Sequence, residues 1–202
     1  MHQAIQRTHR RPPARQLLLS AAARIFARDG LEGATTRAIS REAGVNEVTL
    51  FRHFGSKEHL IEAVVGSEFG AEGLPPSGLS QGRLRLRADL VSFARRYESL
   101  LVDNLPLIRT MIGEIHRHAL CQQQALKGIF WPMRAALVER LELARKTGEA
   151  RPGISSEIAA DIFAGAIMAS VLRRAKSHRQ RGYSAAHYRS ACVDVLLSGI
   201  RG

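Results

Sequence analysis

Cationic and hydroxyl side chains are concentrated between residues 35 and 57, where they could recognise a polyanion. Arg52 offers two parallel donors for a bidentate contact to guanine, the most specific pairing available to a side chain. Lys57 and Arg37 are cations suited to backbone phosphates, and the hydroxyl of Thr49 can bond a phosphate or a base edge. The candidate DNA-contact residues are Thr36, Arg37, Asn46, Glu47, Val48, Thr49, Arg52, His53 and Lys57.

Glu47 is the one acid in this set, and two roles for it remain open. Its carboxylate can accept a hydrogen bond from cytosine N4, although phosphates repel it. It can equally stabilise the positive N-terminal end of a helix dipole. Both roles stand as alternatives at this point.

Two short helices joined by a tight turn are needed to present these side chains. Thr35 or Thr36 can cap the first helix, which runs to about Ala43. Gly44 follows, and glycine adopts the left-handed conformation that ends a helix without steric cost. Asn46 can cap the second helix, which continues to about His53. The expected inward-facing positions are Val45, Leu50 and Phe54. This is the helix-turn-helix arrangement, whose second helix enters the major groove of DNA.

Residues 35–60 read TTRAISREAGVNEVTLFRHFGSKEHL and combine the elements TT, AGV, TLFRHF and SKE. In these elements the chain resembles the tetracycline-repressor (TetR) family of bacterial transcription regulators, over Arg15 to about Ser67. The resemblance implies an all-α fold, operator DNA as partner, a homodimer and a C-terminal ligand domain. It places at or near the operator the residues matching Thr36, Arg37, Glu47, Val48, Thr49, Phe51, Arg52, His53 and Lys57. Phe51 stands where the family usually has tyrosine, so a phosphate contact from that hydroxyl is missing.

The distribution of charge agrees with a nucleic-acid partner. The chain of 202 residues has a net charge of +12. Residues 1–57 hold ten Lys and Arg against four acids, so this quarter of the chain carries half of that charge. A basic balance favours polyanions, either nucleic acid or an anionic membrane surface. The arginine-rich stretch 173–189 would suit a membrane or scaffold role, but no aromatic residue lies between the cations of residues 173–181.

The remaining composition favours a soluble, cytoplasmic protein. Cys121 and Cys192 lack CxxC spacing, so a disulfide framework is not expected. The basic N-terminus has no apolar core of a signal peptide. The apolar run from Ile162 to Leu172 is shorter than the roughly 20 residues that span a bilayer.

The domain organisation follows from composition breaks and helical periodicity. We expect a flexible basic arm at residues 1–14, a three-helix DNA-binding domain with its buttressing helix at 15–69, and an effector and dimerisation domain at 83–202. The boundary lies in the Gly-, Pro- and Ser-rich residues 70–82. The expected fold is all-α, with about nine helices. Beyond the short pair, helices are expected at about 15–29, 58–68, 83–102, 105–120, 122–147 (kinked at Pro132), 155–177 and 185–200.

The last two helices are the expected dimer interface. Residues 158–171 are apolar on every side, so that helix must be covered on every side. One side can face the core of the chain and another a second subunit, giving a four-helix arrangement. The alternative is that both helices are ordinary core of a monomer. The expected interface residues are Ile158, Ile162, Ala166, Ala169, Tyr188, Cys192, Val195 and Leu196.

A ligand pocket is expected between helices of the C-terminal bundle. Its candidate lining residues are Phe93, Tyr97, Met111, Ile115, His116, Phe130, Trp131, Met133, Phe163 and Met168. Each of these is, taken singly, more typical of core packing. As a group they suggest an apolar effector with one or two polar anchors, such as Tyr97 or His116. Binding would then alter the separation or the population of the two DNA-reading heads.

An enzymatic function is not expected, because the sequence has no Gly-rich phosphate loop and no HExxH, GxSxG or CxxC motif. The sequence also has no signature of a cofactor or metal site. The hypothesis is therefore a sequence-specific transcriptional regulator, with repression released by a small apolar ligand. Redox sensing through Cys121 or Cys192 and ligand-independent regulation remain alternatives. The choice between repressor and activator also stays open.

Overall fold

The computed structural model describes residues 12–69, 86–114, 131–150, 153–174 and 182–200. These residues form nine α-helices and no strand, which confirms the all-α prediction. The chain divides into two compact units, Met1–Val64 and Val65–Gly202, which are considered separately below. Most of the expected basic arm, residues 1–11, lies outside the described residues, as does the expected linker at 70–82.

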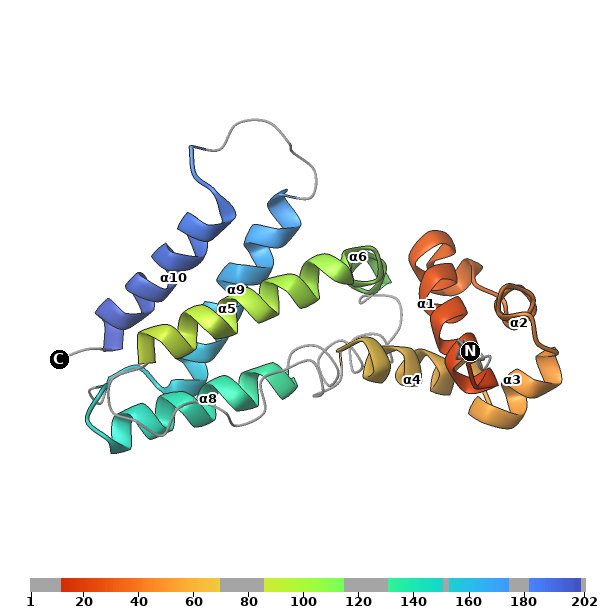
Figure 1. Ribbon diagram of the computed structural model, residues 1–202, viewed down its shortest axis with the longest axis horizontal. Helices are drawn as coiled ribbons and strands as arrows, with labels where there is room; N and C mark the ends of the chain where they lie inside the picture. Colours follow the sequence, from red (N-terminus) through yellow and green to blue (C-terminus); the bar gives the residue numbers. More distant parts are fainter. Residues whose placement is uncertain (1–11, 70–85, 115–130, 151–152, 175–181, 201–202) are drawn as a thin grey trace, which may run out of the picture. The chain divides into compact units, whose positions relative to one another are not determined.

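The N-terminal unit is built on α1 (Ala14–Gly33), which packs against α2 (Thr36–Ala43) and α3 (Glu47–Phe54) (Figure 1). The apolar positions expected to face inward on α1, among them Leu18, Ile25 and Phe26, are buried. At Gly30 the backbone leaves the helical region with φ 76° and ψ 172°, so the long helix ends there and one further turn follows. A positive φ strains residues that carry a Cβ, which is why glycine stands at this break.

The helix ends around the tight turn follow the predicted capping pattern. The side chain of Thr35 accepts a hydrogen bond from the amide of Ala38 at 3.1 Å. Gly44 ends α2 in the left-handed conformation, with φ 66° and ψ 35°. The side chain of Asn46 then accepts a hydrogen bond from the amide of Val48 at 2.9 Å and begins α3. Each cap satisfies an amide that the helix itself leaves unpaired.

The division between the units falls within α4 (Lys57–Phe69). Its side chains Leu60, Ile61 and Val64 are buried, and so is Val65 just beyond the division. The expected helix at about 58–68 therefore agrees with α4 to within one residue at each end.

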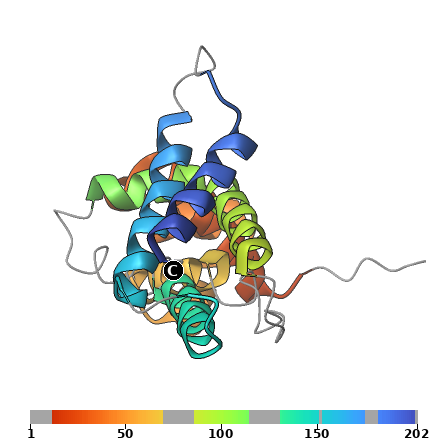
Figure 2. The same cartoon turned by 90° about the vertical axis from the view of Figure 1, so that its left-hand side faces the viewer.

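The C-terminal unit consists of α5 (Leu86–Asp103), α6 (Leu105–Glu114), α8 (Trp131–Lys146), α9 (Ser156–Arg174) and α10 (Ala185–Ile200). Helix α5 packs against both α9 and α10, α8 packs against α9, and α9 and α10 lie side by side (Figure 2). Of the helices expected here, residues 83–85, 115–120, 122–130 and 175–177 lie outside the described residues. Pro132 is the second residue of α8. The turn before it, with which an expected kink at Pro132 would be made, lies outside the described residues. Among the described helices, none is both long and apolar enough to cross a membrane.

Buried ionic groups join helices of this unit that are far apart in the sequence. Arg140 is almost completely buried; its Nε donates to Asp89 Oδ2 at 2.8 Å and its Nη2 to Glu149 Oε2 at 3.3 Å. Glu98 is also buried and accepts hydrogen bonds from Arg174 and Arg189. Because a buried charge is costly unless it is paired, these groups fix which helices lie together.

Candidate functional site

Helix α3 has one face in the core and one face open to solvent. Leu50 and Phe54 are buried, as their spacing predicts. On the opposite side the exposed fraction is 72% for Val48 and 46% for Phe51, and Arg52 is exposed beside them. His53 is exposed too, whereas Thr49 and Asn46 flank the face, the first half-buried and the second exposed. The helix can therefore present both charged and apolar groups to a partner.

Thr36 and Glu47 are joined to each other, which sequence reasoning missed. The hydroxyl of Thr36 donates to Glu47 Oε1 at 2.5 Å, and both side chains are half-buried. The bond ties the first turn of α2 to the first turn of α3. Glu47 also lies in the first turn of its own helix, where a carboxylate is favourable to the dipole. The sequence carries no periodic signal for such a pair, because the two residues belong to different helices.

The cationic side chains of this unit differ in their exposure and in the contacts they already make within the protein. Arg37 is exposed on α2. Lys57 is half-buried, and its Nζ donates to the carbonyl oxygen of Glu32 at 3.5 Å. An ammonium has three donors, so Lys57 keeps others for a phosphate. Arg15 covers the ring of Phe54, with its guanidinium carbon 5.5 Å from the ring centroid.

The aromatic residues predicted to line a pocket form a buried cluster in the C-terminal unit. The ring of Phe93 lies 6.4 Å from that of Tyr97 and 6.3 Å from that of Phe163. Met111 on α6 and Met133 on α8 are buried as well. The hydroxyl of Tyr97 is buried without a hydrogen-bond partner in the described part of the chain. Burial raises the pKa of Tyr97 well above its usual value, so the phenol is neutral.

Two further predicted pocket residues, Trp131 and Met168, are less buried than the residues of this cluster. Trp131 is 55% exposed at the start of α8, two residues before the buried Met133. Met168 is half-buried on α9. Ile115, His116 and Phe130 lie outside the described residues.

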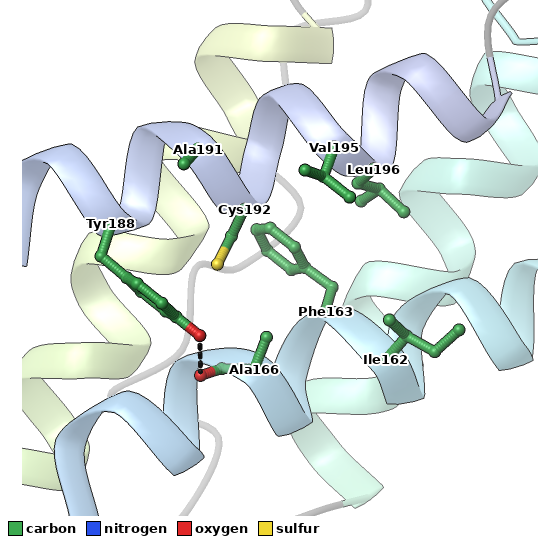
Figure 3. Close-up of a pocket in the computed structure, with 8 residues that line it drawn as sticks. All are labelled: Ile162, Phe163, Ala166, Tyr188, Ala191, Cys192, Val195 and Leu196. Atoms are coloured by element: carbon green, nitrogen blue, oxygen red, sulfur yellow. Dashed lines mark hydrogen bonds between the residues drawn. The ribbon is translucent and has the colours of Figure 1, made fainter. Parts of the chain in front are cut away.

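An apolar groove of about 270 Å³ lies between α9 and α10 (Figure 3). Its lining contains six of the residues predicted for a dimer interface, together with Phe163 and Ala191; the six are Ile162, Ala166, Tyr188, Cys192, Val195 and Leu196. The hydroxyl of Tyr188 closes one end by donating to the carbonyl oxygen of Ala166 at 3.3 Å. Ala191 was not predicted, although it stands one turn from Tyr188 and Val195 on the same helix.

Apolar side chains around this groove remain open to solvent in the single chain. The exposed fraction is 54% for Ile158, 59% for Ile162 and 73% for Val195, and Ala169 is half-buried. Exposed apolar surface of this kind is typical of a site that binds another molecule.

Cys192 lies in the groove, half-buried. Burial raises the pKa of its thiol, against an opposing effect of a hydrogen bond with Tyr188. A raised pKa reduces the thiolate fraction that reacts with oxidants. Cys121, the other residue of the redox alternative, lies outside the described residues.

Comparisons with known proteins identify both units. The family model described as "Bacterial regulatory proteins, tetR family" matches residues 18–64. A second model, "Tetracyclin repressor-like, C-terminal domain", matches residues 83–182. The first match contains α2 and α3 with their caps, and the second contains the aromatic cluster and all of α9.

Individual relatives extend over most of the chain. The uncharacterised HTH-type transcriptional regulator YvkB of Bacillus subtilis is 27% identical over 165 residues, which are 80% of this chain and 83% of that protein. A putative TetR-family regulator from Mesorhizobium loti has a similar structure, with a TM-score of 0.75 and 20% identity over 94% of this chain and 97% of that one. FadR of Bacillus subtilis in complex with stearoyl-CoA gives a TM-score of 0.70 and 18% identity over 92% and 99%.

At these identities the two solved structures establish the fold alone. The two family models cover the helix-turn-helix and the C-terminal bundle in the expected order. The capped helix α3 lies within the first match, and YvkB is similar over most of its length, so the assignment does not depend on one motif. The chain belongs to the TetR family of bacterial regulatory proteins and is a helix-turn-helix transcriptional regulator.

Proposed function

We propose that the protein is a homodimeric repressor, acting in the cytoplasm, that binds operator DNA through α3 and is released by a small, mostly apolar effector. The observation that carries the proposal is the pairing of an exposed, capped reading helix in one unit with an uncovered apolar face in the other. A regulator that reads two half-sites needs both. Its function is binding rather than catalysis.

The proposed dimer forms through α9 and α10. A two-fold axis brings the same patch of two chains together, so a patch must complement itself. Ile162 and Val195 line the apolar groove and remain largely exposed in the single chain. The identical groove of a partner chain would give these side chains apolar contacts. Covering these side chains would remove apolar surface from water at about 25 cal/mol per Å².

The proposed DNA contacts divide into positioning and reading. Arg37, Lys57 and His53 are assigned to phosphates, which set register without reading sequence. Arg52 is assigned to a guanine, where it makes two parallel hydrogen bonds. The bond from Thr36 favours a positioning role for Glu47 within the protein over contact with cytosine.

The proposed effector site is the buried aromatic cluster. A buried hydroxyl without a partner costs about 1–3 kcal/mol, so an effector that bonds the hydroxyl of Tyr97 would recover this cost. The surrounding rings of Phe93 and Phe163 favour an apolar body for the same ligand. FadR, a protein of the same fold, was solved in complex with stearoyl-CoA, which supports the proposal that the C-terminal unit of this chain binds a ligand.

Footprinting on promoter fragments, including the one upstream of the protein's own gene, tests the DNA-binding proposal. We expect two protected half-sites at physiological salt, and higher reporter expression from that promoter when the gene is deleted. Reporter expression that falls on deletion would indicate an activator instead. Binding to anionic vesicles without binding to any promoter fragment would contradict the proposal and favour the membrane-surface alternative.

The substitution Tyr97→Phe tests the effector proposal. It removes only the hydroxyl, so the effector-free protein should melt no lower than the wild type. Release of DNA by an effector found in a small-molecule screen should then require about 2- to 13-fold more ligand, the equivalent of a hydrogen bond worth about 0.5–1.5 kcal/mol. A lower melting temperature with unchanged effector response would assign the hydroxyl to the fold.

A further inference from the structure

Two large apolar side chains are exposed on the reading helix. Within the described part of the N-terminal unit, Val48 and Phe51 are the large hydrophobic residues that remain exposed, at 72% and 46%. They are three residues apart on α3, so they share one face of the helix. Arg52, four residues after Val48, completes that face. The other large apolar residues described in this unit are buried or half-buried, which makes this pair a feature of the surface that meets the partner.

The largest apolar group on the base edges in the major groove is the C5-methyl of thymine. Cytosine has only a hydrogen at that position, and the nitrogen and oxygen groups of the base edges donate or accept hydrogen bonds. Val48 and Phe51 can do neither with their side chains, so packing against a polar edge would leave that edge unpaired at a cost. Packing against a methyl group instead removes apolar surface of both partners from water.

We infer that Val48 and Phe51 are specificity-determining residues that recognise thymine methyl groups in each operator half-site, next to the base pair contacted by Arg52. The inference rests on the proposed binding of α3 to operator DNA. It predicts thymines at fixed positions of the half-site. The basic character of residues 1–57 favours duplex DNA as the occupant of this apolar face over another protein surface.

The chemistry of Phe51 supports this assignment. A tyrosine at this position would have a hydroxyl for a phosphate, but the phenyl ring has none. Its exposed edge therefore gains nothing from the sugar-phosphate backbone beyond van der Waals contact. Val48 is β-branched and stiff, so it can hold its methyl groups in place at little entropic cost.

Deoxyuridine substitution tests the inference directly, because uracil lacks the methyl group and keeps the pairing of thymine. Each thymine of a footprinted operator is replaced in both half-sites, and dissociation constants are measured by fluorescence anisotropy at fixed salt. One buried methyl is worth about 0.8 kcal/mol, or about fourfold in affinity. We expect about a 15-fold loss when a recognised position is replaced in both half-sites.

Variants assign the effect to the two side chains. Val48→Ala and Phe51→Ala should each bind the thymine operator more weakly and lose most of the uracil penalty at one position. Val102→Ala is the matched control, since Val102 is a valine of the C-terminal unit that is also half-exposed. It should keep the wild-type pattern. Helix content and melting temperature of the variants should be unchanged, because the substituted side chains are exposed.

Equal affinity for the thymine and uracil operators, or a uracil penalty that persists in Val48→Ala and Phe51→Ala, would overturn the inference while leaving DNA binding intact. A protein that binds no promoter fragment would contradict the proposed function itself.

Discussion

In the N-terminal unit, the side chains that cap α2 and α3 bond amides two or three residues away. In the C-terminal unit, the buried ionic groups pair across 51, 76 and 91 residues. The helix ends of the N-terminal unit are thus specified by residues that are neighbours in the sequence. The packing of the C-terminal unit is specified by side chains that meet only after folding. Local caps can set a small helical unit before the rest of the chain is ordered, whereas the bundle depends on its long-range contacts.

The exposed surfaces of the two units differ as well. Helix α3 mixes a cation with two apolar residues, Val48 and Phe51, as a surface for a polar and charged duplex does. The face of α9 and α10 exposes Ile158, Ile162 and Val195 around an apolar groove. The composition of each surface therefore fits the partner proposed for it, duplex DNA for the first and a second copy of the chain for the second.

The largest expected effect is on the long-range contacts of the bundle. Arg140→Met leaves Asp89 and Glu149 buried without their cation, and we expect a loss of about 3–5 kcal/mol in the free energy of unfolding. Urea unfolding followed by amide exchange should locate the loss in α5 and α8. Arg134→Met on the same helix is the control, because its pairs with Asp161 and Glu157 are exposed and should matter little. Equal destabilisation by both variants would remove the distinction between buried and surface pairs.

Replacing the buried carboxylate as well tests whether the loss comes from an unpaired charge. The double variant Arg140→Met, Asp89→Leu should recover part of the loss, because replacing a buried ion pair by apolar residues is often neutral. No recovery would mean that Arg140 stabilises the bundle through Glu149 or through packing of its side chain.

The next effect concerns the apolar face of α9 and α10. Ile162→Asp puts a charge at the proposed interface of each protomer, where it would be buried without a partner. We expect a monomeric mass in analytical ultracentrifugation and operator affinity reduced about 100-fold, through loss of the second half-site contact. Val102→Asp, an exposed position outside the groove, should leave both unchanged. A dimer that survives Ile162→Asp with full operator binding would place the interface elsewhere.

The sequence predicted what depends on neighbouring residues. Gly44 and Asn46 are predicted as helix ends, and Thr35 or Thr36 as the first cap, because capping and left-handed glycine are local properties. The structure selects Thr35. Inward positions such as Leu50 and Phe54 followed from helical periodicity. The same reasoning placed α4 and α10 to within one residue.

Contacts between distant side chains were beyond that reasoning. The bond of Thr36 to Glu47 and the ion pairs of Arg140 and Glu98 have no signature in spacing. Trp131 was expected in a pocket because it is large and aromatic, yet it is exposed in the structure. Whether an aromatic residue faces the core depends on the helix register, which composition does not give.

A smaller effect should separate reading from positioning on the DNA-binding surface. Arg52→Ala should cost about 1–3 kcal/mol on the preferred operator and relax the choice of base at one position. Lys57→Ala should weaken binding to all sequences alike and lower the salt slope by about 1. Dissociation constants on a set of operator variants at several salt concentrations measure both. If the two variants behave identically across that set, the division between the two roles fails.

The smallest expected effect tests whether the cap of α2 stabilises only the N-terminal unit. Thr35→Ala removes the cap of α2, at a cost of about 1 kcal/mol, so amide exchange in α2 should rise about fivefold. Thr35→Ser keeps the hydroxyl and should leave exchange close to that of the wild type. Amides of α5 and α9 should be protected equally in both variants, because the hydrogen bond of Thr35 is to Ala38 in its own helix. Faster exchange in α5 after Thr35→Ala would mean that the stability of the bundle depends on the capped reader, and the contrast between the two units would not hold.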